Sequence, residues 1–418
     1  MDRRLSDDSA ERFSAYLDGL SSVVGHAARI GPLRDYCSGL LLPGERKSVE
    51  PMAAATAPAR VSAQHQALLH FVGEGGWSDE TMLAKVRDMV LPKIERHGAV
   101  EAWIIDDTGM PKHGRHSVGV ARQYCGQLGK QDNCQVAVSL SIANHHASLP
   151  VAYRLYLPKD WTADDERRRK AGIPDDVVFK TKPQIALDQI RWACDAGLPR
   201  APVLIDAGYG ADTDLRAEIT ALDLVYVVGI RTNTVARVAV AVGATDPEPE
   251  PASVEAIALG LRKKAWRTIE WREGTNAPLT GRFARVRVRV THGGAKATAA
   301  RADEWLLIEW PEDEKKPTKY WFSTLGKEID LARMVDMAKL RWRIERDYLD
   351  LKQEVGLGHF EGRGWRGFHH HATLCIAAYG FLISERGIFS PSGYRSWNIV
   401  ERSSVCENYR PRGTAVTA

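Results

Sequence analysis

Three acidic residues stand where they could bind divalent metal ions and act on a phosphodiester. Asp106 follows the apolar run Trp103–Ile105, and Asp206 follows the apolar run Val203–Ile205. In the sheet expected from the order of the strands, these two runs are neighbours, so their carboxylates could meet. Two carboxylates close together repel each other unless a cation lies between them. Because Mg²⁺ prefers hard oxygens and keeps several waters, a carboxylate pair with a substrate phosphate suits it.

The third acid has a better-defined position. Arg341, Glu345 and Lys352 are separated by 4 and 7 residues, which places them on one face of a helix. An apolar stripe with the same spacing runs one residue earlier, about 100° round the helix: Leu340, Ile344, Leu351 and Val355. A carboxylate on the polar face can face Asp106 and Asp206, with two cations beside it for phosphates. The alternatives are a helix cap or loop residue for either aspartate alone, and an ion-paired helix surface for Glu345.

Three motifs give the chain a resemblance to a known family. They are IIDDTGMPKHG, VLIDAGYG and RWRIERDYLDLKQEVGLGHFEGRGWRGFHHH. They resemble the insertion-sequence transposases of the DDE superfamily, in particular the group with a Y-x2-R-x3-E-x6-K signature and a β-rich insertion before the glutamate. The resemblance covers roughly residues 30–385.

The resemblance implies that Asp106, Asp206 and Glu345 bind two Mg²⁺ ions, with Mn²⁺ as a substitute, and that Arg341 and Lys352 hold phosphates near the cut. It implies a transposase that acts on double-stranded DNA, at transposon ends and at the target, as a homo-oligomer in a synaptic complex. Cleavage would free a 3′-hydroxyl for strand transfer. Two alternatives are an RNase H-like endonuclease without strand transfer and a non-catalytic DNA-binding derivative, although all three acids are present.

Two positions leave details of the site open. The tyrosine of the signature falls on Ala338, so its role is absent or taken over by another residue. Asp107 is an alternative first ligand. In the D-x-T frame Asp106 is the ligand, and Asp107 points to the opposite face of a regular strand. A bulge in the strand would reverse this choice.

Basic residues gather in short segments. The net charge of +4 does not by itself indicate nucleic acid, but local groups act on phosphates over a Debye length of ~8 to 10 Å. The segments include a glycine-rich loop over 109–130, the run 167–170 and the alternating FARVRVRV at 283–290. A DNA-backbone contact and a solvated surface are the two interpretations of each. The DNA-binding candidates in them are Lys112, Arg115, Arg285, Arg287 and Arg289.

The elements that position these residues predict an α/β fold. Amphipathic helices fill residues 1–95, as a DNA-binding bundle or as a helical cap. A strand at 101–107 and period-two strands at 136–142 and 151–157 predict an antiparallel meander. The strands at 203–205 and 225–228 alternate with helices, which favours parallel pairing. This order predicts an RNase H-like three-layer core with a mixed sheet, an N-terminal helical domain and a β-rich insertion.

Five segments are expected along the chain. They are a helical DNA-binding candidate (1–95), the first part of the RNase H-like core (96–230), the β-rich insertion (231–328), the C-terminal core helices (329–390) and a basic tail (391–418). Within the fourth segment, one helix is expected over 330–356 and another over 368–385.

Composition limits the remaining functional classes. Hydrophobic residues make up 44% and charged residues 26% of the chain, as in soluble globular proteins. The sequence shows no long apolar span and no secretory signal, so a cytoplasmic protein of bacterial type, acting on the chromosome without a membrane, is expected. Gly208 and Gly210 do not complete a cofactor-binding loop. Of the three histidines at 369–371, one is expected to be buried and two exposed.

Overall fold

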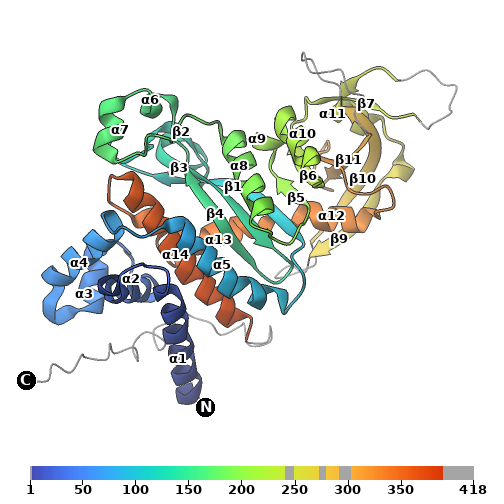
Figure 1. Cartoon of the computed structure of the whole chain (residues 1–418). Helices are drawn as coiled ribbons and strands as arrows, with labels where there is room; N and C mark the ends of the chain where they lie inside the picture. The colour runs from blue at the N-terminus through green and yellow to red at the C-terminus, as the bar shows by residue number, and fades with distance from the viewer. Residues whose placement is uncertain (1, 241–248, 273–278, 291–302, 389–418) are drawn as a thin grey trace, which may run out of the picture. The chain divides into compact units, whose positions relative to one another are not determined.

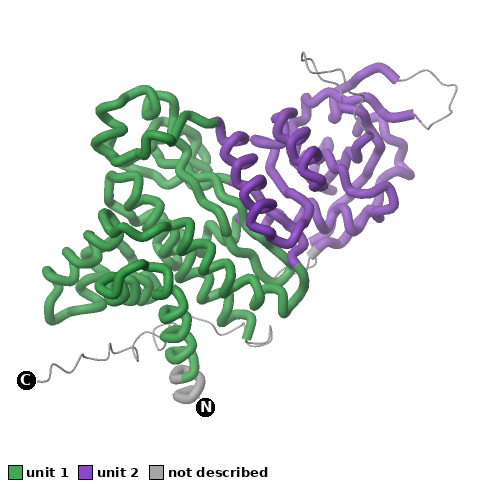
Figure 2. Tube along the Cα trace, in the orientation of Figure 1, with its two compact units in different colours: residues 1–99, 107–180, 345–418 green, residues 100–106, 181–344 purple. Residues whose placement is uncertain are grey.

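The computed structural model describes residues 2–240, 249–272, 279–290 and 303–388, and the chain divides into two compact units (Figure 1, Figure 2). Unit 1 comprises residues 1–99, 107–180 and 345–418, and unit 2 comprises residues 100–106 and 181–344. The predicted basic tail, 391–418, lies outside the described residues. The two units do not test the five segments predicted from the sequence, so those segments stay a prediction.

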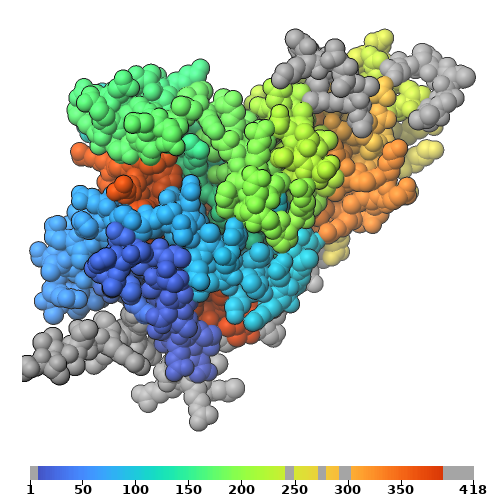
Figure 3. All heavy atoms as spheres, viewed as in Figure 1, coloured from blue at the N-terminus to red at the C-terminus, as the bar shows by residue number. Residues whose placement is uncertain are grey.

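Unit 1 begins with five helices, α1 (Asp2–Ser21), α2 (Ile30–Leu41), α3 (Val49–Thr56), α4 (Val61–Gly73) and α5 (Asp79–Glu95). The long C-terminal helix α14 (Trp365–Arg386) packs against α2, α4 and α5, and Figure 3 shows these blue and red segments side by side. Its side chains are buried along most of its length because these helices and a strand, β4 (Ser148–Leu155), pack against it. Among the described residues, no helix combines the length and the apolar composition needed to cross a bilayer.

Unit 1 also contains strands, two pairs of which are antiparallel. They are the end of β1 (Ala102–Pro111), β2 (Ala121–Cys125), β3 (Lys130–Ala143) and β4 (Ser148–Leu155), followed by the short helices α6 (Lys159–Thr162) and α7 (Asp165–Ala171). The predicted β3–β4 hairpin is confirmed. The expected loop over 109–130 is partly wrong, because β2 lies inside it and pairs with the start of β3. β2 and the first few residues of β3 are polar and short, so they lack the apolar alternation that indicates a strand.

Unit 2 contains a large mixed sheet. Its strands are the start of β1, β5 (Val203–Ile205), β6 (Tyr226–Ile230), β7 (Val235–Val238), β8 (Ala252–Ser253), β9 (Arg267–Arg272), β10 (Leu279–Val290), β11 (Glu304–Trp310) and β12 (Lys319–Ser323). β1, β5 and β6 are parallel, and β12, β11 and β10 continue the sheet in antiparallel order. The predicted α/β class, with a mixed sheet and helices, is confirmed.

The helices of unit 2 connect these strands. They are α8 (Lys182–Asp195), α9 (Ala207–Gly210), α10 (Thr213–Ala221), α11 (Val254–Gly260) and α12 (Leu331–Leu340), and α13 (Trp342–Gln353) starts in this unit and continues in unit 1. The prediction of a single helix over 330–356 is wrong, because the structure has two helices there. Arg341 ends α12, and α13 begins at the next residue. The predicted apolar stripe through both helices is confirmed, since all four of its side chains are buried.

The three consecutive histidines of α14 are all buried, which corrects the expectation of two exposed rings. Each ring points to a different part of unit 1. His369 accepts a hydrogen bond from the Leu155 amide, and His370 lies between the carbonyls of Val72 and Trp77. The sequence could not show this burial because each ring depends on a polar partner that is distant in the chain.

His371 should make the stability of unit 1 depend on pH. Its neutral ring fits its partners, with Nε2 donating to the Gly356 carbonyl (3.1 Å) and Nδ1 accepting from the Tyr36 hydroxyl (2.9 Å). Burial lowers the pKa of His371 to about 4, so the unfolded chain binds the proton more tightly. The free energy of unfolding should therefore fall as the pH drops from 6.5 towards 4.

Urea denaturation at a series of pH values measures this dependence. His371→Gln should reduce this dependence but not abolish it, because burial also lowers the pKa of the neighbouring His370 to about 4. His70→Gln, at an exposed position on α4, should leave the dependence unchanged. Equal pH dependence in the wild type and in His371→Gln would contradict the assignment.

Candidate active site

Asp106 and Asp206 follow paired positions on two adjacent parallel strands of unit 2. Ile105 of β1 is in register with Ile205 of β5, and each aspartate is the next residue. Neighbouring strands lie about 4.8 Å apart, and residues in register point to the same face of a sheet. The predicted pairing of these two strands is confirmed. It places two carboxylates directly after the last paired residues of β1 and β5.

Arg341 supplies a positive charge at this carboxylate pair. Its Nη1 lies 2.7 Å from Oδ2 of Asp106, and both side chains are largely shielded from solvent, at 23% and 16% exposure. An ionised donor and acceptor at this distance make a strong hydrogen bond. Since Arg341 occupies the junction between α12 and α13, this ion pair fixes the start of α13 relative to β1 within unit 2.

Asp206 is the N-cap of the short helix α9. Its Oδ1 accepts hydrogen bonds from the amides of Gly208 (2.9 Å) and Tyr209 (3.2 Å). The sequence had offered a helix cap as the alternative to metal binding. The two roles are compatible, because a carboxylate has about four lone-pair sites and the cap uses one oxygen. The cap also holds the carboxylate in one orientation.

Close backbone contact places α9 against β6. A Cβ on Gly210 would lie 1.9 Å from the Gly229 carbonyl oxygen, and one on Gly229 would lie 2.8 Å from the Ala207 nitrogen. Both positions therefore require glycine. The buried Arg216 guanidinium donates to the Gly210 carbonyl from α10 and adds a second support. The spacing of Gly208 and Gly210 gave no signal of this packing role, because the contact forms only when α9 meets β6.

The last turn of α12, just before Arg341, is fixed by a buried ion pair. Lys339 Nζ lies 2.6 Å from Glu309 Oε1, with the two side chains only 11% and 10% exposed. The ammonium also faces the rings of Trp271 and Trp321, with its nitrogen 4.6 and 5.7 Å from their centroids. Burial lowers the pKa of Lys339, and the hydrogen bond to Glu309 opposes that shift.

Lys339→Met should destabilise the protein because it leaves the Glu309 carboxylate buried without its ammonium partner. Removing one member of a buried pair costs several kcal/mol, and the residual exposure here suggests a loss of about 2 to 3 kcal/mol. Urea denaturation measures the change. The double variant Lys339→Met/Glu309→Leu should recover most of the loss. A single variant as stable as the wild type would contradict this role.

Unit 1 carries the other residues predicted for the acidic site. Glu345 is exposed in the first turn of α13, and Lys352 lies in its last turn. Lys352 Nζ donates to the Gly109 carbonyl at 2.8 Å, and burial lowers its pKa, while the nearby Asp107 opposes the shift. Because Glu345 and Asp107 belong to unit 1 and the other two acids to unit 2, the convergence of three carboxylates stays a prediction.

Hydrogen bonds within unit 1 anchor the part of α13 that follows Glu345. The Tyr348 hydroxyl lies 2.8 Å from the Ser139 hydroxyl on β3, and Ser148 on β4 donates to Asp347 at 2.6 Å. The Tyr379 hydroxyl of α14 donates to the same carboxylate at 2.9 Å. The helix that carries Glu345 and Lys352 is therefore held rigidly within this unit.

The remaining DNA-binding candidates have mixed surroundings. Lys112 donates to the carbonyls of Gly358 and Phe360, and burial lowers its pKa to about 8. Arg115 is exposed. On β10 the predicted arginine face is only half-exposed: Arg285 and Arg287 lie over Trp305 and donate to backbone carbonyls, and Arg289 pairs with Asp303. Their role in DNA binding stays a prediction.

Comparisons with known proteins show the family to which the chain belongs. The family model described as DDE superfamily endonuclease matches residues 18–278, and the model described as Transposase DDE domain matches residues 179–381. A relative named "Probable transposase for insertion sequence element IS701", from Microchaete diplosiphon, is 31% identical over 169 residues, which is 40% of this chain and 41% of the relative. The chain thus spans about two fifths of the length of this curated relative.

Among solved structures, a chain of the piggyBac transposase synaptic complex with hairpin DNA matches with a TM-score of 0.44 and 10% identity, over 90% of this chain and 70% of that one. A TM-score this low carries no argument about the site. The match to the DDE superfamily endonuclease model covers more than half of the chain and includes Asp106 and Asp206. The chain belongs to the DDE superfamily endonuclease family, as its motifs predicted.

Proposed function

We propose that the protein is a DNA transposase that cleaves transposon ends and transfers the freed 3′ ends to target DNA, using two Mg²⁺ ions bound by Asp106, Asp206 and Glu345. The observation that carries the proposal is the register of Ile105 with Ile205, which brings two aspartates to one end of paired parallel strands. These hard oxygen donors suit Mg²⁺, and Mn²⁺ can replace it. The substrate is double-stranded DNA.

The contact of Arg341 with Asp106 supports Glu345 as the third ligand. The two residues are only four positions apart in the chain, and Arg341 is ion-paired with Asp106. The short chain between them supports a glutamate close to the aspartate pair. Asp107 remains the alternative to Asp106, but the Arg341 ion pair and the β5 register both favour Asp106.

The residues of this chain would bind and orient the DNA strand. Two divalent ions, when bound, would activate a water or a 3′-hydroxyl and stabilise the leaving oxygen. The α9 amides of Gly208 and Tyr209 hold Oδ1 of Asp206 by hydrogen bonds, which leaves Oδ2 for a metal ion. The Arg341 guanidinium has five N–H donors, so it can keep its bond to Asp106 and also reach a phosphate oxygen. Lys352 adds a second cation for the phosphate backbone.

Cleavage and strand transfer should be tested with the DNA that flanks the gene. The protein is incubated with labelled flanking DNA and Mg²⁺, and the products are sized. Discrete cleavage at terminal inverted repeats, lost when the ions are chelated, is the expected result. Cleavage that persists after chelation, or no specific cleavage with Mg²⁺ or Mn²⁺, would contradict the proposal.

An endonuclease that cuts without joining is the second candidate. Pre-cut ends with a free 3′-hydroxyl, mixed with a target plasmid, distinguish the two activities. A transposase should join both ends in a concerted way, because a synapse needs two ends and therefore a homo-oligomer. Cleavage without any joined product would assign the endonuclease instead.

A further inference from the structure

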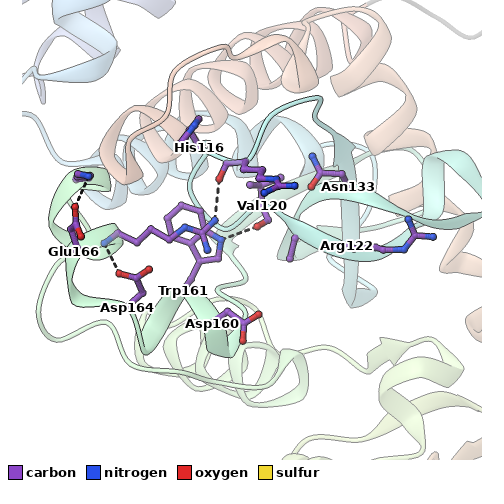
Figure 4. Close-up of a pocket in the computed structure, with 12 residues that line it drawn as sticks. His116, Val120, Arg122, Asn133, Asp160, Trp161, Asp164 and Glu166 are labelled. Atoms are coloured by element: carbon purple, nitrogen blue, oxygen red, sulfur yellow. Dashed lines mark hydrogen bonds and ion pairs between the residues drawn. The ribbon is translucent and has the colours of Figure 1, made fainter.

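A polar cavity of about 560 Å³ lies within unit 1 and is lined by none of the residues proposed to bind metal (Figure 4). Its walls come from the connection between β1 and β2, from the β2–β3 hairpin, and from the segment with α6 and α7. Cavities of 300 to 1,000 Å³ typically hold small ligands, so this one has room for a single nucleotide.

Arg167 forms a fixed planar surface in this cavity. Its guanidinium lies 3.7 Å from the ring centroid of Trp161, and its Nη2 donates to the Arg115 carbonyl at 3.0 Å. Trp161 is itself buried and donates from Nε1 to the Val120 carbonyl at 2.8 Å. A guanidinium held in one plane can stack on a nucleobase with little loss of side-chain entropy.

Both carboxylates and cations line the cavity. Figure 4 shows Asp160, Asp164 and Glu166 to the left of and below Trp161, His116 above it, and Arg122 to its right. Asp164 caps α7, and Glu166 pairs with Lys170 at 2.6 Å, so two of the carboxylates have local partners. A ligand with an anionic end and hydrogen-bond donors at its other end matches this arrangement. Carboxylates accept hydrogen bonds from base amino groups, and arginine binds phosphates.

We propose that this cavity holds one unpaired nucleotide of the DNA substrate. The base stacks on the Arg167 guanidinium, with its amino group toward the carboxylates, and the phosphate lies beside Arg115, His116 and Arg122. This inference rests on the proposed action on DNA and adds to it a base-binding site separate from the metal-binding residues. Adenine, cytosine and guanine, which carry amino groups, fit better than thymine.

Fluorescence of 2-aminopurine tests the assignment in the full chain. The probe is a short single-stranded oligonucleotide with one central 2-aminopurine, whose emission falls when the base stacks. The wild-type protein should quench it. An unlabelled deoxyadenosine oligomer should displace the probe at least about fivefold better than an oligomer of abasic sites, because base stacking contributes that much or more. Free dAMP should compete more weakly than the oligomer, because it lacks the neighbouring phosphates.

Two variants on the same short helix provide the matched comparison. Arg167→Ala should lose the quenching and weaken probe binding about five- to tenfold. Arg167→Lys should behave similarly, since an ammonium keeps the charge but not the planar surface. Arg169→Ala, at an exposed position outside the cavity lining, should stay within about twofold of the wild type. Equal loss in Arg167→Ala and Arg169→Ala would overturn the proposal.

The competition experiments need no variant, and each of them can overturn the proposal by itself. Abasic oligomer competing as well as deoxyadenosine oligomer would show that only phosphates bind. Free dAMP competing as well as the oligomer would assign a free-nucleotide site instead. Failure here is distinguishable from failure of the proposed function. Flanking-DNA cleavage without Arg167-dependent quenching removes only the cavity assignment, whereas quenching without metal-dependent cleavage removes only the transposase assignment.

Discussion

Glu345→Gln is expected to lower Mg²⁺-dependent cleavage of transposon-end DNA by about a thousandfold while leaving DNA binding within a few-fold of the wild type. The substitution keeps the size of the side chain and removes the negative charge that a divalent ion requires. Losses of two to three orders of magnitude are typical when one charge-stabilising group leaves an active site. Cleavage is measured by product sizing and binding by electrophoretic mobility shift.

Glu361→Gln is the matched control for this experiment. Glu361 is also in unit 1, its side chain is 56% exposed, and it pairs with the exposed Arg46. Exposed ion pairs contribute little, so cleavage should stay close to the wild-type rate. Wild-type cleavage by Glu345→Gln, or an equal loss in both variants, would remove Glu345 from the metal site.

Gly210→Ala is expected to disturb the active site without touching a carboxylate. The added Cβ would lie 1.9 Å from the Gly229 carbonyl oxygen, so α9 must move away from β6. Asp206 caps α9 and would move with it. Overpacking of this kind costs about 1 to 3 kcal/mol of stability, and a displacement of about 1 Å at a reacting group can lower the rate about a hundredfold.

Thermal denaturation and the cleavage assay together measure this effect. Gly260→Ala is the control, because nothing lies within 4 Å of a Cβ at that position. It should leave both the melting temperature and the cleavage rate near their wild-type values. If Gly210→Ala cleaves and melts as the wild type does, α9 does not hold Asp206 in the way inferred from its contact with β6.

Much of the scaffold could be predicted from periodicity. The alternating apolar residues of β3 and β4 predicted a hairpin, and the short apolar runs before Asp106 and Asp206 predicted paired strands. The 3.6-residue stripe through α12 and α13 predicted a buried helical face. These features succeed because burial of a regular element leaves a regular pattern in the sequence.

The features that fix the site in place leave no such pattern. The contact between Gly210 and Gly229 depends on two backbones that meet only after folding. The Lys339–Glu309 pair joins an α12 residue to a β11 residue 30 positions earlier, which no local spacing indicates. The polar strand β2 was also missed, because its pairing with β3 rather than apolar burial defines it.

The claim on which the function depends is that Asp106, Asp206 and Glu345 share divalent ions. The most direct measurement is a crystal structure with cleaved-end DNA and Mn²⁺, in which anomalous scattering locates the ions. We expect manganese peaks within about 2.0 to 2.3 Å of carboxylate oxygens from all three residues. Manganese bound to the two aspartates, with the Glu345 carboxylate remote from every peak, would contradict the account.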